Sequence, residues 1–290
     1  MVNFSVVDLS PGLYFVATPI GTARDITLRA LDLLASADIL VAEDTRSLRR
    51  LMQIHGVPLD GRRVLAYHDH SRPGDRDAIV KQVIAGRSVV YAPEAGTAMV
   101  SDPGFMLGRA VVEAGGEVTA APGPSALLAA LTVSGLPSDR FLFAGFPPQK
   151  AGPRAAFFAE LATVPATIVF YAAPKRVRQV LEELCVSWGD KRPAVLCREL
   201  TKRFEETMRG TLRSVRERLG ETDPRGECVL LVGPPVANRA ADPEGVAEAL
   251  DDALTRLSVR DAAAEVAEMF GLPRRTVYQD ALSRQRGGTE

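Results

Sequence analysis

Two polar clusters follow short apolar runs directly, at 43–46 (Glu-Asp-Thr-Arg) and at 68–70 (His-Asp-His). A carboxylate or an imidazole can take a proton from a weakly acidic group in a transition state. The same side chains often do no more than cap a loop or a helix, and the sequence alone leaves both roles open. The candidates for a general base are Glu43, Asp44 and His68.

Metal chemistry is a weaker expectation. His68 and His70 lie two residues apart on an extended segment, which puts them on one face, but no third ligand of suitable spacing follows. The three cysteines are widely spaced and form no paired motif, so we expect packing residues rather than a disulfide framework or a zinc site. No metal is therefore expected.

Three loops have compositions that suit close contact with a ligand. The first contains Pro19 and Gly21, which fix a direction and permit an unusual backbone conformation. The second, 92–104, is longer than the roughly two to six residues of most strand-to-helix connections. The third is the rigid turn Pro122-Gly123-Pro124-Ser125, where Ser125 can cap an apolar helix that starts at Ala126.

Five short apolar runs in the first half predict buried strands, with amphipathic helices between them. Asp25 or Thr27 can cap the first of these helices. The result is an α/β doubly wound sheet, in which ligands bind outside the carboxyl ends of the strands. The expected strands are 13–17, 39–42, 64–67, 88–91 and 118–121, and the expected helices include 48–54, 76–85, 106–114 and 126–133.

A second strand and helix pattern follows, and then a polar linker and helices. Strands are expected at 141–143, 167–171, 194–198, 206–208 and 228–232, and helices at 154–162, 175–184, 246–257, 259–270 and 276–286. The last two helices resemble a helix-turn-helix, although a plain helical hairpin fits the pattern equally well. We therefore expect α/β domains at 1–136 and 137–235 and a helical appendage at 244–290.

The composition is that of a globular chain. Of its 290 residues 46% are hydrophobic and 24% charged, with a formal net charge of −1. No apolar run is long enough to span a membrane, and the first ten residues lack the features of a signal peptide, so a cytoplasmic protein is expected. The GxxxxGK[ST] and GxGxxG signatures are absent, which disfavours ATPases and dehydrogenases.

Several segments resemble one family, the ribosomal RNA small subunit methyltransferase I family. They are LYFVATPIGTARDITLRAL, VAEDTR, YHDH, EAGTAMVSDPG, PGPSALLAAL, SGLPSDRFLFAGF and RELTKRFEE. The resemblance is collinear from about Gly12 to Val232, and a similar helical appendage occurs in the family. Where the family usually has Ser-Asp-Ala-Gly-Thr-Pro, this chain has Pro93-Glu-Ala-Gly-Thr-Ala98.

The resemblance implies a fold of the tetrapyrrole methylase type, with S-adenosyl-L-methionine in the cleft between two α/β domains. It also implies 2′-O-methylation of a cytidine in 16S rRNA, with free rRNA or the small ribosomal subunit as partner. The cofactor would meet Pro19, Gly21, Glu94, Ala95, Gly96, Thr97, Ala98, Pro122, Gly123, Pro124, Ser125 and Ala126. Basic residues would meet phosphates, which positions the RNA without reading its sequence. They are Arg46, Lys150, Arg198, Lys202, Arg203, Arg274 and Arg275.

Two other functions remain open. One is a methylase of the same fold that acts on a tetrapyrrole or another small molecule. The other is a non-catalytic RNA-binding protein whose altered loop at 93–98 no longer holds the cofactor. The sequence also leaves open whether the chain acts as a homodimer.

Overall fold

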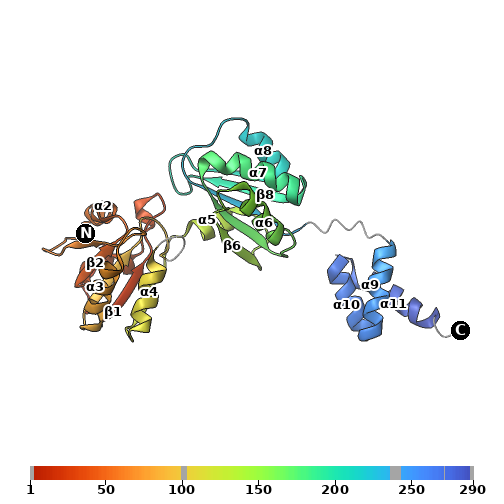
Figure 1. Ribbon diagram of the computed structural model, residues 1–290, viewed down its shortest axis with the longest axis horizontal. Helices are drawn as coiled ribbons and strands as arrows, with labels where there is room; N and C mark the ends of the chain where they lie inside the picture. The colour runs from red at the N-terminus through yellow and green to blue at the C-terminus, as the bar shows by residue number, and fades with distance from the viewer. Residues whose placement is uncertain (1–2, 99–102, 236–242, 271, 288–290) are drawn as a thin grey trace. The chain divides into compact units, whose positions relative to one another are not determined.

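The computed structural model describes residues 3–98, 103–235, 243–270 and 272–287. Contacts between residues divide the chain into two compact units, Met1–Pro234 and Pro235–Glu290 (Figure 1). The first unit contains two five-stranded sheets, and the second is helical.

The first sheet is entirely parallel, with the strand order β3-β2-β4-β1-β5. Its strands are β1 (Gly12–Val16), β2 (Ile39–Ala42), β3 (Val64–Ala66), β4 (Ser88–Ala92) and β5 (Val118–Ala121). The connecting helices are α1 (Leu28–Ser36), α2 (Thr45–His55), α3 (Pro73–Ile84) and α4 (Gly104–Glu113). The prediction of a doubly wound α/β sheet is confirmed.

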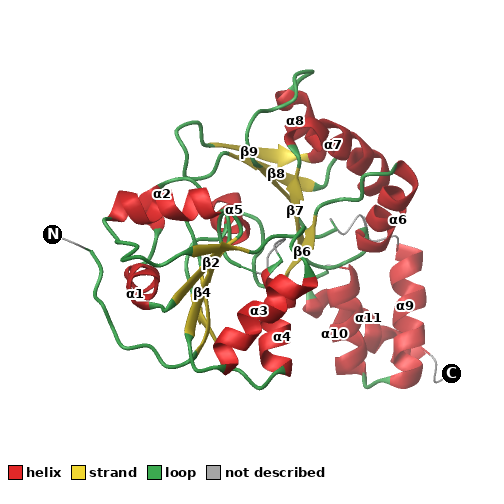
Figure 2. Cartoon of the chain, turned by 60° about the vertical axis from the view of Figure 1, so that its left-hand side comes forward, coloured by secondary structure: helices red, strands yellow, loops and turns green. Residues whose placement is uncertain are grey.

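Successive side chains along each strand point to opposite faces of this sheet, and helices cover and bury both faces. On one face Val16 packs with Leu31 of α1 and Met52 of α2. On the other face Leu13 packs with α3 and α4. Figure 2 shows the two pairs of helices on either side of the strands. This layering fixes the strands, and with them the loops at their carboxyl ends.

The second sheet is mixed, with the order β6-β7-β10-β8-β9. Only β6 and β7 run parallel to each other, whereas β10 pairs antiparallel with both β7 and β8, and β8 pairs antiparallel with β9. The strands are β6 (Phe141–Gly145), β7 (Thr167–Ala172), β8 (Pro193–Arg198), β9 (Glu206–Thr211) and β10 (Cys228–Val232). Helices α6 (Ala151–Leu161), α7 (Pro174–Trp188) and α8 (Leu212–Leu219) cover one face.

Helix α5 (Ala126–Ser134) connects the two sheets. It follows β5 of the first sheet, but its Ala130 and Leu131 pack against Val195 and Leu231 of the second. Ile20, from the loop after β1, belongs to the same apolar cluster. The loop after β1 therefore shares a core with α5 and the second sheet.

Two predicted helix caps need correction. A short 3-10 helix, Ala23–Asp25, precedes α1, and the residue that caps α1 is Thr27, whose Oγ1 accepts a hydrogen bond from the Ala30 N–H at 3.1 Å. Asp25 does not cap α1, because it lies within that short helix. Ser125 occupies the N-cap position of α5, but its side chain makes no capping hydrogen bond. Only its carbonyl oxygen takes part, by accepting the Ala129 N–H.

The second unit contains α9 (Pro243–Arg256), α10 (Val259–Phe270) and α11 (Arg274–Gly287). Leu250, Val266 and Val277, one from each helix, are almost fully buried in a common core. Arg284 of α11 forms an ion pair with Asp251 of α9 at 2.9 Å. This arginine therefore links two helices of the unit. Within the described parts of the chain, no helix is both long and apolar enough to cross a membrane.

Candidate active site

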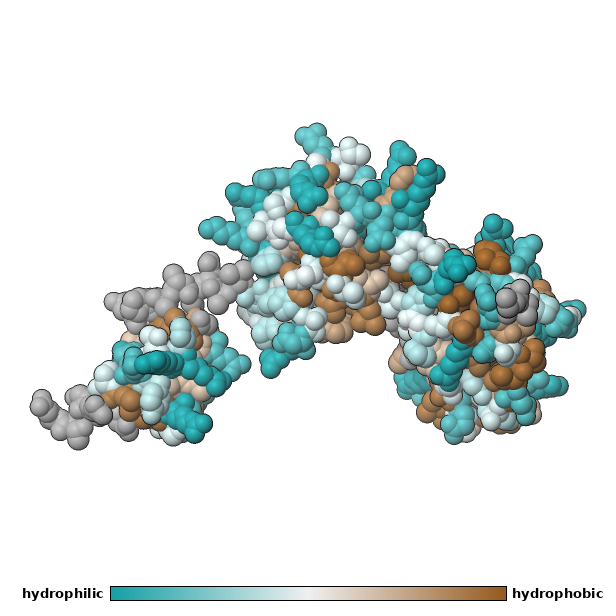
Figure 3. All heavy atoms as spheres, turned by 180° about the vertical axis from the view of Figure 1, so that it is seen from behind, coloured by the Kyte–Doolittle hydropathy of each residue, from teal (hydrophilic) through white to brown (hydrophobic). Residues whose placement is uncertain are grey.

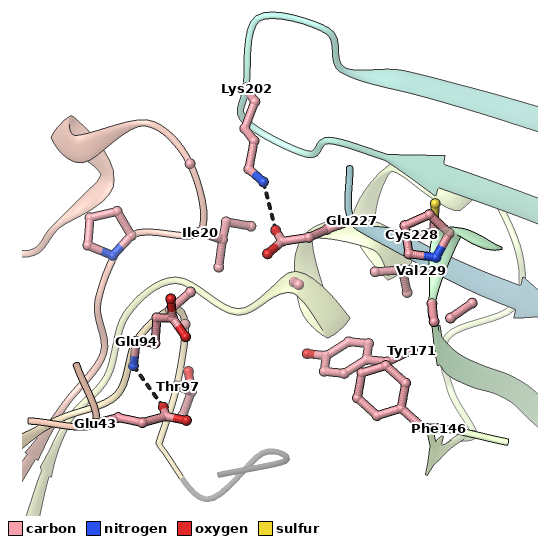
Figure 4. A pocket seen from close by; sticks show the side chains of 18 of the residues that line it. Ile20, Glu43, Glu94, Thr97, Phe146, Tyr171, Lys202, Glu227, Cys228 and Val229 are labelled. Carbon is pink, nitrogen blue, oxygen red and sulfur yellow. Dashed lines mark hydrogen bonds and ion pairs between the residues drawn. The ribbon is translucent and has the colours of Figure 1, made fainter. Parts of the chain in front are cut away.

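A pocket of about 630 Å³ lies between the two sheets (Figure 4). One wall comes from loops at the carboxyl ends of β1, β2 and β4. The other comes from the segments next to β6, β7, β8 and β10. The lining residues of the first wall are Pro19, Ile20, Gly21, Glu43, Ser47, Glu94, Ala95, Gly96 and Thr97. Those of the second are Phe146, Tyr171, Ala172, Ala173, Pro174, Lys202, Glu227, Cys228 and Val229, with Ala126 of α5 between the walls.

Backbone hydrogen bonds tie the loops of the first wall together. Thr18 and Gly96 exchange two N–H to carbonyl bonds of 2.9 Å, and the Thr18 hydroxyl donates to the Pro93 carbonyl at 3.2 Å. Gly96 has φ of 78°, a left-handed conformation that glycine adopts without a steric penalty. Thr97 donates its hydroxyl to the Pro124 carbonyl at 2.9 Å. The three predicted ligand loops therefore form one connected surface.

Glu43 is half-buried in the pocket and faces the loop after β4. Its Oε2 accepts the backbone N–H of Glu94 at 2.9 Å, which is drawn as a dashed line in Figure 4. No other hydrogen bond of this carboxylate occurs among the described residues. Glu43 therefore links two loops and keeps an oxygen that can accept a proton.

Asp44 is the N-cap of α2 and does not line the pocket. Its Oδ1 accepts the N–H groups of Arg46 at 2.7 Å and Ser47 at 3.2 Å, and its Oδ2 lies 3.1 Å from the Arg46 guanidinium. The Arg46 side chain and these two N–H groups lower the pKa of Asp44 from 3.8 to about 2. Such a carboxylate is a weak base, so the geometry favours Glu43 over Asp44.

His68 lies outside the pocket lining, on the exposed loop that follows β3. Its backbone N–H donates to the Ser71 hydroxyl at 2.9 Å, and its ring centroid is 6.2 Å from that of His70. In the described part of the chain, no three His, Cys, Asp or Glu side chains are grouped closely enough to hold a metal ion.

The predicted cofactor residues fall into two groups. Pro19, Gly21, Glu94, Ala95, Gly96, Thr97 and Ala126 line the pocket. Ala98 is 6% exposed and belongs to the core beneath the loop. The turn Pro122–Ser125 is not part of the lining, and a Cβ on Gly123 would approach the Ala17 Cβ to 2.9 Å. This turn therefore contacts the pocket wall, since the Pro124 carbonyl also accepts the Thr97 hydroxyl at 2.9 Å.

Of the basic residues predicted to meet RNA, Lys202 lines the pocket. Its Nζ lies 3.0 Å from Glu199 and 2.7 Å from Glu227. Burial acts to lower the pKa of Lys202, but the bonds to Glu227 and Glu199 outweigh it and raise the pKa. Lys202 is therefore a paired cation between two carboxylates rather than a free phosphate ligand.

The other predicted basic residues lie outside the pocket lining. Arg198 pairs with Glu206 at 3.0 Å. The exposed Arg203 stacks over the Phe204 ring, with 5.4 Å between its guanidinium carbon and the ring centroid. Arg46, Lys150, Arg274 and Arg275 are exposed, the last two at the start of α11.

The sequence-based prediction missed most of the second wall. Tyr171 could have been inferred, because it lies at the end of a buried strand, as Glu43 does. Glu227 was harder to find, because β10 runs antiparallel to β7, with Cys228 opposite Ala172. The start of β10 therefore lies beside the end of β7. Glu227 precedes its strand, so the rule that ligands bind at the carboxyl ends of strands does not identify it.

The chain matches known families over nearly all of its length. Residues 12–216 match the family model described as Tetrapyrrole (Corrin/Porphyrin) Methylases. Residues 239–285 match the model described as the RsmI C-terminal HTH domain.

Curated relatives share the name ribosomal RNA small subunit methyltransferase I. The protein of Mesorhizobium japonicum is 43% identical over 94% of this chain and 92% of its own length. That of Xylella fastidiosa is 40% identical over 93% of this chain and 98% of its own length.

Solved structures share the fold over most of this chain at low sequence identity. The methyltransferase CobJ superimposes with a TM-score of 0.60 at 20% identity, covering 81% of this chain and 98% of its own. Uroporphyrin-III C-methyl transferase of Thermus thermophilus, complexed with S-adenyl homocysteine, gives 0.52 at 22% identity, covering 77% and 97%.

Proposed function

We propose that this chain, which belongs to the ribosomal RNA small subunit methyltransferase I family within the tetrapyrrole methylases, methylates 16S rRNA. The methyl group would pass from S-adenosyl-L-methionine to the 2′-oxygen of a cytidine. The observation that carries the proposal is the pocket between the sheets, where hydrogen-bonded loops of the first sheet meet the carboxylate of Glu43. Relatives that align along nearly the whole chain bear the corresponding name.

The pocket suits the cofactor in size and in the small side chains of its lining. Its volume of about 630 Å³ falls within the roughly 300–1,000 Å³ that is usual for small-molecule sites. Ala95, Gly96 and Ala126 offer small side chains that let a ligand approach the backbone. We assign to the cofactor the residues Pro19, Gly21, Glu94, Ala95, Gly96, Thr97 and Ala126, with Ala98 and Pro122–Ser125 as the layer behind them.

When bound, the cofactor supplies an electrophilic methyl group on a sulfonium. The chain has to hold the acceptor hydroxyl in line with that methyl and keep water away from it. Glu43 would accept the hydroxyl proton on its carboxylate as the new bond forms. Its bond to the Glu94 N–H fixes the carboxylate beside the loop that would hold the cofactor.

We assign RNA binding to exposed cations outside the pocket and to the second unit. Arg46, Lys150 and Arg203 are exposed on the first unit, and Arg274 and Arg275 on the second. In this scheme the α/β domain at 1–136 supplies the cofactor loops and the domain at 137–235 completes the cleft. The helical appendage at 244–290 binds RNA. The partner would be 16S rRNA or the small ribosomal subunit, and the reaction would take place in the cytoplasm.

Two measurements test the proposal. Calorimetry should show binding of S-adenosylhomocysteine, and labelled S-adenosylmethionine should transfer its methyl to a 2′-oxygen of 16S rRNA or of the small subunit. Binding without transfer to RNA would favour a methylase that acts on a small molecule. Absence of binding would favour a non-catalytic RNA-binding protein.

A further inference from the structure

The loop that connects β6 to α6 presents an aromatic ring at the pocket. Phe146 is the first residue after β6, and it lines the pocket although 56% of it is exposed. Its ring lies edge-to-face with that of Tyr171, with centroids 5.6 Å apart at 66°. Figure 4 shows the two rings together on the wall opposite Glu43 and Glu94.

A buried cation holds this loop in place. Arg154 is 1% exposed, and its guanidinium forms a two-pronged ion pair with Glu183 at 2.6 and 2.5 Å. Its Nη1 donates to the carbonyls of Pro148 at 3.0 Å and Gln149 at 2.7 Å. The Arg176 side chain also donates to the Gln149 carbonyl. Burying a charge is costly unless geometry and bonding are satisfied, so this cation is used to fix two loop carbonyls.

Tyr171 supports the Phe146 ring from within the core. Its ring packs edge-to-face on Phe143, with centroids 4.8 Å apart. Burial raises the pKa of Tyr171, and a hydrogen bond with the Leu127 backbone acts in the opposite direction. The Phe146 ring therefore contacts Tyr171, and the loop that follows it is fixed by the hydrogen bonds from Arg154.

Exposure alone does not assign a role to a phenylalanine. Apolar surface is visible over both sheets (Figure 3), and single exposed apolar residues are common in folded proteins. Phe146 differs because it faces a pocket and lies four residues before an exposed cation, Lys150. Proteins commonly hold single-stranded nucleic acid with aromatic rings on which bases stack and with basic side chains that contact phosphates along the same strand.

We propose that Phe146 is the platform on which the nucleobase of the RNA acceptor stacks. The inference rests on the proposed function and adds a binding residue to it. The opposite wall carries the loops assigned to the cofactor, so the aromatic wall is left for the acceptor nucleotide. Lys150 would meet a phosphate of the same strand.

The first test replaces the ring while it keeps apolar bulk. In Phe146→Leu, the KM for 16S rRNA should rise roughly 5- to 150-fold, the range expected for loss of one stacked base. The Kd for S-adenosylhomocysteine should stay unchanged. Phe141→Leu is the matched control, because Phe141 lies at the other end of β6, is 42% exposed and does not line the pocket. An unchanged KM in Phe146→Leu, with an active wild type, would overturn the inference and leave the proposed function intact.

A fluorescent reporter separates the two nucleobases that could stack there. The sequence contains one tryptophan, Trp188, which packs under Arg192 at 4.1 Å, so Phe146→Trp adds a distinct signal. A cytidine-containing RNA oligonucleotide should quench the added fluorescence, and S-adenosylhomocysteine alone should not. Quenching by S-adenosylhomocysteine alone would assign the platform to the cofactor adenine and overturn the inference. A wild type that transfers no methyl to RNA would refute the proposed function instead.

Discussion

Neighbouring carboxylates take on different tasks because the chain changes direction between them. Glu43 directly follows β2 and lines the pocket, whereas Asp44 is the N-cap of α2. The Oδ1 of Asp44 accepts the N–H groups of Arg46 and Ser47 at the start of that helix, which have no partner within it, and its Oδ2 pairs with the Arg46 guanidinium. The general-base role can therefore be argued for Glu43 alone of the two.

Glu43→Gln tests that role. The amide oxygen of glutamine can still accept the Glu94 N–H, so the tie between the loops should survive. Loss of the base should lower the methyl-transfer rate by roughly 10²- to 10⁴-fold. Single-turnover kinetics measure this rate, and calorimetry with S-adenosylhomocysteine checks that the pocket is intact. An unchanged rate with intact binding would exclude Glu43 as the base.

Asp44→Asn should leave the rate nearly unchanged, because asparagine is also a good N-cap. It should alter the pH dependence of stability instead. The pKa of Asp44 in the folded chain, about 2, lies below the ordinary 3.8. Its contribution is therefore complete above about pH 4 and is lost as the pH falls towards 2. The melting temperature of the variant should decline less over this range than that of the wild type. Parallel curves would contradict the assignment.

At the scale of elements, the pocket depends on a close approach of two loops. The Thr22 N–H donates to the Thr201 hydroxyl at 3.2 Å, and the Thr22 hydroxyl donates to the Thr201 carbonyl. Glu199 and Thr201 have φ of 52° and 63°, in the left-handed region that residues other than glycine seldom occupy. The loop after β8 is thus held in a strained conformation against the loop after β1.

Gly21→Ala should disturb this approach. A Cβ there would lie 2.5 Å from the Lys202 Cγ, 2.7 Å from the Thr201 Oγ1 and 3.1 Å from the Leu200 carbonyl oxygen. The lysine can move aside, but the backbone carbonyl cannot move without shifting the loop. We expect about 1–3 kcal/mol of destabilisation and weaker binding of S-adenosylhomocysteine. Gly152→Ala is the control, because no heavy atom lies within 4 Å of its added Cβ. Equal effects in both variants would refute the predicted clash.

The sequence predicted those elements whose signals are local. Strands β2, β5 and β10 and helix α10 have the expected bounds, because apolar runs or spacing define each of them. Helix α8 was not predicted, since much of its sequence is charged and only Leu212 and Val215 are buried. Its start is instead marked by the mutual hydrogen bonds of Thr211 and Ser214.

The site was predicted mainly on the side where the sheet is parallel, and of the second wall Lys202 was predicted, as an RNA contact. The loop at 19–21 and Glu43 were assigned to one crevice because strand ends in a parallel sheet gather at one edge. The loop at 94–98 was identified by its length and by the family resemblance. Glu227 was not predicted, because its place depends on the pairing of β10 with β7. Phe146 was not predicted, because its place depends on the hydrogen bonds from Arg154 to the loop after β6. Those interactions join residues far apart in the sequence, and no local pattern encodes them.

At the scale of the molecule, the second unit should be separable. Its three helices share one core, so a cut after Pro234 removes a complete unit, whereas a cut after Leu257 would leave α9 without its partners. Residues 1–234 should bind S-adenosylhomocysteine with the affinity of the full chain and bind rRNA more weakly. Calorimetry and filter binding measure the two. If the truncated chain lost affinity for S-adenosylhomocysteine, the second unit would contribute to cofactor binding and the prediction would be wrong.

Arg274 and Arg275 allow stability and RNA binding to be separated within that unit. They are exposed at the start of α11, where the helix dipole disfavours a cation by about 0.3–1 kcal/mol each. The double variant Arg274→Glu, Arg275→Glu should therefore melt no lower than the wild type. It should still bind rRNA more weakly, with a salt dependence flatter by about one slope unit for each phosphate that the variant no longer neutralises.

Arg284→Gln is the contrasting variant, because Arg284 pairs with Asp251 at 2.9 Å. It should destabilise the unit and leave the salt slope unchanged. A double variant with an unchanged slope would show that these two arginines do not bind RNA phosphates.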